Sequence, residues 1–139
     1  MKNRRQNRKE IISIIYKYYL LEREFNLNQL FEEEDDLDNS QFNELKEIFI
    51  NINKYELIIK PFLKDGWTWD RISPLIKGIL IYATYEFAIT PPKIVVNEAI
   101  EITKEYFDVE GNEDYKMVNA ILSNVFKLIK SKITKKETE

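Results

Sequence analysis

The residues with the clearest chemical potential lie at the beginning of the sequence, where basic side chains gather without an acid among them. Five of the first nine residues are basic: Lys2, Arg4, Arg5, Arg8 and Lys9. Three of the chain's five arginines lie here, although the chain carries sixteen lysines. A guanidinium offers a planar fork of donors that grips phosphate and stacks on bases, so this choice of residue favours a phosphate or nucleic-acid contact. A frayed, solvated N-terminus is the alternative.

Two residue types that carry much of enzyme chemistry are missing from the sequence. The 139 residues include no histidine and no cysteine, which excludes thiolate nucleophiles, disulfides, Ser-His-Asp triads and the usual zinc and haem sites. Catalysis would have to rely on Asp, Glu, Lys, Tyr or a Mg²⁺ ion held by oxygen atoms. No acidic pair has a spacing that differs from that of a solvated helix face. We therefore expect a binding protein with no catalytic residue, metal or cofactor.

A second charged segment, residues 32–38, carries six acids in seven positions. A run of like charges is typical of a loop or a frayed helix end. The ligand positions of a calcium-binding loop can be laid over residues 36–47, but the position that needs glycine for a sharp turn is Gln41. The sequence therefore predicts no calcium site here. Asp38 or Ser40 is instead expected to cap the following helix.

Helices must position these residues, because only three glycines and four prolines punctuate the chain and no segment alternates like a strand. Apolar residues recur at helical spacing over residues 7–25, 41–64, 72–87, 90–106 and 117–129. The third of these segments is apolar around most of its surface and is expected to be the most buried helix. Gly66 is expected to close a turn over which Trp67 and Trp69 pack, and Thr90 to cap the fourth segment.

These segments predict an all-α fold in a single domain over residues 1–131, followed by a polar tail over residues 132–139. The basic residues are expected at, or inside, the first turns of the first helix. The longest run without a charge, Met117–Phe126, is ten residues, far shorter than the roughly 20 apolar residues of a membrane-spanning helix. We expect a cytoplasmic protein that does not contact a membrane.

Three separated stretches together form a pattern that extends over most of the chain. They are the basic start RRQNRKEIISIIYKY, the segment ILIYATYEF joined to TPPKIVVNEAIEITKEYF, and YKMVNAIL. In order, spacing and residue type they resemble the NusB family of bacterial transcription antitermination factors, and the second stretch is the most specific. The resemblance implies about seven helices, arranged as two three-helix bundles with an N-terminal amphipathic helix.

The same resemblance implies a function without chemistry. It implies binding to single-stranded boxA-type RNA from a ribosomal leader transcript, together with the ribosomal protein NusE, in the transcription elongation complex. Arg4, Arg5 and Arg8 match the family's RNA-contacting arginines, and further RNA contacts are implied at Tyr16 and Lys116. Lys2 and Lys9, which belong to the same basic group, complete the candidate RNA-binding set.

A partner-binding face is implied on the helix that ends in the Tyr-Glu pair, at Ile76, Lys77 and Ile81. The family often carries an acid and an arginine where Ile76 and Ile81 stand, so the sequence departs from the family's pattern on this face. Polar residues early in a helix or beside a core usually satisfy neighbouring groups, so four others are expected to be structural: Tyr85, Glu86, Asn97 and Glu98. A protein-only helical adaptor or homodimer, with no specific RNA ligand, remains the alternative.

Overall fold

The structure is a computed structural model that describes residues 2–138. Seven α-helices lie in this part of the chain, with two short 3₁₀ helices and no strand. The α-helices are α1 (Arg4–Leu20), α2 (Leu27–Glu33), α3 (Asn39–Ile50), α4 (Ile52–Ile59), α5 (Pro74–Glu86), α6 (Pro92–Tyr106) and α7 (Asp114–Thr138), and the 3₁₀ helices are η1 (Lys60–Phe62) and η2 (Trp69–Arg71). The expected all-α class and the seven helices are confirmed.

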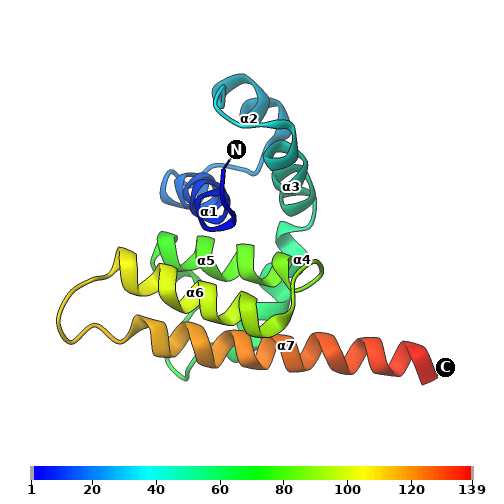
Figure 1. Ribbon diagram of the computed structural model, residues 1–139. Coiled ribbons are helices and arrows are strands. Elements are labelled where there is room, and N and C mark those ends of the chain that lie inside the picture. The colour runs from blue at the N-terminus through cyan, green and yellow to red at the C-terminus, as the bar shows by residue number, and fades with distance from the viewer. Residues whose placement is uncertain (1, 139) are drawn as a thin grey trace.

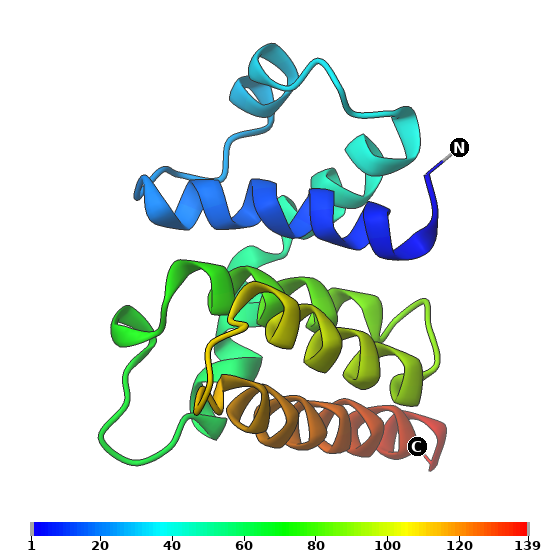
Figure 2. The same ribbon diagram turned by 60° about the vertical axis from the view of Figure 1, so that its left-hand side comes forward.

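The helices form two groups of three that are linked by α4 (Figure 1). Helices α1, α2 and α3 form the first group, and α5, α6 and α7 pack against one another in the second. Helix α1 lies along α5, and this is the most extensive contact between any two helices (Figure 2). The basic start of α1 therefore lies against the second group rather than at a free end of the molecule.

Helix α5 is the centre of the core, as its apolar surface predicts. Nine of its thirteen residues are buried: Ile76, Gly78, Ile79, Leu80, Ile81, Tyr82, Ala83, Thr84 and Glu86. At Gly78 the backbone of α5 approaches that of α1 closely. A Cβ atom at this position would lie 3.1 Å from the carbonyl oxygen of Ile12 and 3.3 Å from the amide nitrogen of Tyr16. The two helices can pack this closely because Gly78 has no side chain.

Several element boundaries differ from the sequence prediction. The prediction of one helix over residues 41–64 is wrong. The segment is broken at Asn51, which ends α3 and begins α4. The Asn51 side chain donates a hydrogen bond to the Glu47 carbonyl oxygen, and such local bonds compete with regular helix. Thr90 does not cap α6, since Pro91 occupies the N-cap position. Helix α1 begins at Arg4, three residues earlier than expected.

The C-terminal segment and the two tryptophans also differ in part from expectation. Helix α7 continues to Thr138, so the segment expected to be a polar tail is helical as far as it is described. Trp69 is buried in the core, whereas Trp67 is exposed and stacks with Arg71. Within residues 2–138, no helix is long and apolar enough to cross a membrane. No group of three or more acidic side chains in this part of the chain is placed to hold a metal ion.

Asp38 caps α3, as the sequence predicts, and its removal should destabilise the protein. The Asp38 carboxylate accepts a hydrogen bond from the backbone N–H of Gln41 at 2.8 Å. The Gln41 side-chain oxygen accepts one from the backbone N–H of Asp38, which completes a capping box. We expect Asp38→Ala to lower the free energy of unfolding by about 1 kcal/mol, measured by urea denaturation. Ser40→Ala is the control, because Ser40 is exposed and does not cap the helix. An equal loss in both variants would contradict the assignment of the cap.

Candidate nucleic-acid interface

The basic residues occupy the first turns of α1, where their charges oppose the helix dipole. Asn3 is the N-cap and accepts from the Gln6 amide at 2.8 Å, and the first turn contains no acid. Cations at a helix N-terminus are unfavourable unless something else compensates them. Carboxylates from α5 and α6 supply that compensation, and they lie 78 to 96 residues away in sequence.

Arg8 is the buried member of the basic group. Its Nε donates to Glu86 Oε1 at 2.9 Å and its Nη2 to Glu86 Oε2 at 2.7 Å, which is a two-bond fork. The two side chains are only 5% and 2% exposed. Hydrogen bonding to Glu86 raises the pKa of the Arg8 guanidinium, which therefore stays charged. Arg8 is enclosed and satisfied in this structure, where it positions α1 on α5, and the contact with phosphate that was expected of it would require this pair to open.

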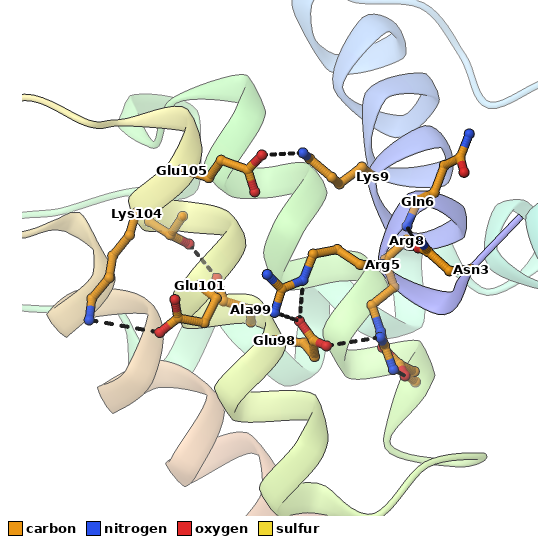
Figure 3. A network of polar contacts seen from close by, with 12 residues as sticks. Asn3, Arg5, Gln6, Arg8, Lys9, Glu98, Ala99, Glu101, Lys104 and Glu105 are labelled. Carbon is orange, nitrogen blue, oxygen red and sulfur yellow. Dashed lines mark hydrogen bonds and ion pairs between the residues drawn. The ribbon is translucent and has the colours of Figure 1, made fainter.

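The other basic side chains reach solvent while they are paired. Arg5 bonds Glu98 on α6 through Nε at 2.9 Å and Nη2 at 2.6 Å, and Lys9 pairs with Glu105 one helical turn further along α1 (Figure 3). Arg4 donates to Glu86 at 3.1 Å and to the Thr90 hydroxyl. The side chains of Arg4, Arg5 and Lys9 are 56%, 46% and 30% exposed.

Lys2 faces a different part of the molecule, toward α3. Its Nζ lies 2.9 Å from Glu10 and donates to the Gln41 side chain at the same distance. The Glu10 carboxylate accepts hydrogen bonds from Lys2 and from Gln41. Both lower the pKa of Glu10, and the bond from Lys2 has the larger effect. Five basic residues thus face the carboxylates of four acids, Glu10, Glu86, Glu98 and Glu105. No acid lies among the first nine residues of the sequence, but in space four carboxylates lie beside the basic group.

A shallow hollow of about 500 Å³ opens beside Arg5 and Lys9. Its lining combines two cations that can hold phosphate, amides and hydroxyls that can bond base edges, one aromatic ring and one carboxylate, that of Glu10. These residues are Asn3, Arg5, Gln6, Lys9, Glu10, Ser13 and Tyr106. The Lys9 Nζ lies 5.7 Å from the centre of the Tyr106 ring, which is itself exposed. Asn3 and Gln6 are both exposed, and the Asn3 side chain also caps α1. This mixture of groups is what an unstacked nucleotide requires.

Sequence reasoning missed Tyr106, Asn3 and Gln6 as parts of this hollow. Tyr106 ends α6, about a hundred residues after Lys9, and its helical spacing indicates a core position rather than an exposed one. Asn3 and Gln6 lie within the basic segment and have polar amides. Their position among the arginines was a usable signal, because amides commonly bond base edges in single-stranded nucleic acids.

The two outlying RNA-binding candidates are not joined to the basic group by any contact within the described residues. Tyr16 is half-buried on α1 and its hydroxyl makes no hydrogen bond in that part of the chain. It follows Arg5 and Lys9 on one face of α1 by helical spacing. Lys116 lies at the start of α7 and pairs with Glu113 at 2.9 Å, which raises the pKa of the lysine. Contact of either residue with RNA remains a prediction.

The proposed partner face on α5 needs correction. Ile76 and Ile81 are only 2% and 0% exposed, so their side chains belong to the core and cannot contact a partner in this conformation. Lys77 is partly exposed, with its Nζ 5.2 Å from the Tyr19 ring and 5.4 Å from the Trp69 ring. Of the three candidates, only Lys77 can contact a docked protein.

The residues expected to be structural fall into two classes. Glu86 and Glu98 hold the arginines of α1, and burial raises the pKa of Tyr85 to about 12. Asn97 differs, because it is exposed and its side chain makes no hydrogen bond among residues 2–138. The structural interpretation therefore holds for the two glutamates and is wrong for Asn97.

Comparison with known proteins gives one consistent result. The model of the NusB family matches residues 5–127. The chain is 31% identical over 130 residues to the transcription antitermination protein NusB of Staphylococcus epidermidis, covering 88% of this chain and 98% of that protein. It is 30% identical over 132 residues to the Staphylococcus aureus protein of the same name, covering 90% and 99%.

The fold agrees with these sequence matches. A solved structure of Thermotoga maritima NusB superimposes with a TM-score of 0.71 at 26% identity, covering 91% of this chain and 92% of that one. The family model begins at residue 5, so it includes Arg5 and Arg8. Arg4 lies one residue before it. The chain therefore belongs to the NusB family of transcription antitermination proteins.

Proposed function

We propose that this NusB-family protein binds boxA-type single-stranded RNA together with the ribosomal protein NusE, and that it acts in the transcription elongation complex. The family is non-enzymatic, so the function is binding. The observation that carries the proposal is the hollow beside α1, where exposed cations, amides and an aromatic ring converge. It offers separate groups for the phosphates and for the bases of a single strand.

In this mechanism Arg5 and Lys9 hold phosphates, and Arg4 and Lys2 extend the positive edge around the start of α1. The Tyr106 ring provides a surface on which a base can stack, and Asn3 and Gln6 can bond its edge. Arg8 does not touch the RNA but keeps α1 fixed on α5. A protein partner would dock on another face of the helices, where Lys77 is accessible.

The electrostatic part of binding should be modest. Four basic residues remain accessible once Arg8 is assigned to the core: Lys2, Arg4, Arg5 and Lys9. Each phosphate contact contributes about 0.7 to the slope of log affinity against log salt for single strands, so we infer a slope of about −2 to −3. A partner that contacts the same RNA would add to this limited affinity.

We expect the variant with both Arg5→Ala and Lys9→Ala to bind a boxA-type RNA about tenfold more weakly than the wild type. The variant loses two charge-assisted contacts, while the carboxylates that these residues release are partly solvated. The measurement is fluorescence anisotropy of a labelled RNA, with and without NusE. Circular dichroism should show an unchanged helical content.

The matched control is the variant with both Lys54→Ala and Lys64→Ala, which makes the same change in net charge. Both lysines are exposed and lie on α4 and the loop after η1. Equal weakening in the two double variants would show a general charge effect and contradict the site. If NusE binds but RNA neither binds nor strengthens that complex, the protein is a protein-only adaptor.

A further inference from the structure

Two carboxylates of α6 pair with the accessible cations Arg5 and Lys9 of α1. Glu98 presents one oxygen, Oε2, to both the Nε and the Nη2 of Arg5, at 2.9 and 2.6 Å. This is the arrangement in which a guanidinium holds an oxygen of a phosphate. Glu105 accepts a single contact from the Lys9 ammonium, and both pairs bridge α1 and α6 (Figure 3).

These two pairs differ in burial from the pair at the centre of the network. The Arg8 and Glu86 side chains are enclosed, so no ligand can exchange with either of them. Glu98 and Glu105 are 21% and 49% exposed, and Arg5 and Lys9 are also open to solvent. The other oxygen of Glu98, Oε1, lies 3.4 Å from Nη1 of the buried Arg8. Exposed ion pairs are weak because water and salt compete with them, so an incoming phosphate can replace these carboxylates.

We propose that Glu98 and Glu105 are internal competitors of RNA phosphate for Arg5 and Lys9, and that they set the RNA affinity of the protein; this inference rests on the proposed function. In the free protein the two acids neutralise Arg5 and Lys9 and keep the charged groups of these two residues at the hollow. When RNA binds, its phosphates take the same donors, Glu105 returns to water, and Glu98 releases Arg5 while it keeps its contact with Arg8. The acids therefore lower affinity while they keep the cations in position.

The test replaces each competitor with its uncharged isostere and measures binding of a fluorescein-labelled boxA-type RNA by anisotropy at low salt. The variants are Glu98→Gln, Glu105→Gln and the combination of both. Glu101→Gln is the matched control, since Glu101 is an exposed acid on the same helix that pairs weakly with Lys104 at 3.9 Å and not with α1. Thermal unfolding of each variant checks that the fold is retained.

We expect each single variant to bind RNA about two- to fivefold more tightly than Glu101→Gln, and the combined variant more tightly than either. The gain should shrink as salt is raised, because screening weakens the competing pairs. Affinities equal to that of the control would overturn the inference while RNA binding by the wild type still supports the proposed function. Absence of RNA binding by every protein, including the combined variant, would overturn both.

Discussion

The Glu86→Ala variant is expected to unfold with a free energy about 3–5 kcal/mol smaller than that of the wild type, the loss typical of a buried charge left without its partner. The Glu86 side chain is 2% exposed and accepts both hydrogen bonds of the Arg8 fork. After its removal, Arg8 keeps only a 3.4 Å contact with Glu98, inside a site that water barely reaches. Urea denaturation followed by circular dichroism measures the loss.

Two further variants separate the buried charge from the loss of packing. Glu105→Ala removes an exposed partner of α1 and should cost at most about 1 kcal/mol. A variant with both Arg8→Met and Glu86→Leu removes both charges and keeps the volume, so it should be markedly more stable than Glu86→Ala alone. A loss below about 1 kcal/mol in Glu86→Ala would contradict the assignment of this pair as the bond that fixes α1 on α5.

The pair also shows where sequence reasoning reached its limit. The choice of arginine over lysine at the start of the chain is a correct sign that bidentate bonding matters there. The partner of Arg8, however, is a carboxylate 78 residues away rather than a phosphate. Local sequence contains no sign of this compensation, because Glu86, Glu98 and Glu105 reach α1 only after α5 and α6 have packed against it.

The type and order of the helices were more predictable than the buried side of each helix and the residues at which it begins and ends. The apolar residues of α5 predict its central place, but a helix that is apolar on nearly all sides gives no sign of which positions face solvent. The family resemblance placed Ile76 and Ile81 on a partner face, and the apolar pattern of α5 contained nothing that could correct it. The break at Asn51 was hidden because apolar spacing continues across it from α3 into α4.

Gly78 is the position at which the smallest chemical change should have a large structural effect. We expect Gly78→Val to lower the free energy of unfolding by about 3 kcal/mol or more, at the upper end of the losses caused by overpacking. The first added atom would lie 3.1 Å from the Ile12 carbonyl oxygen and 3.3 Å from the Tyr16 amide nitrogen. Both neighbours are backbone atoms, which cannot rotate away, so α1 itself must move off α5.

Gly78→Ala should lose less, because alanine adds only the first atom and favours helix over glycine by about 1 kcal/mol. Ala120→Val is the control: it adds the same β-branching to an exposed position on α7, and its cost should stay below about 1 kcal/mol. Because α1 carries Arg5 and Lys9, Gly78→Val should also weaken RNA binding under conditions in which the protein is still folded. Unfolding free energies within about 1 kcal/mol for Gly78→Val and the wild type would show that α1 and α5 do not depend on close backbone packing at this position.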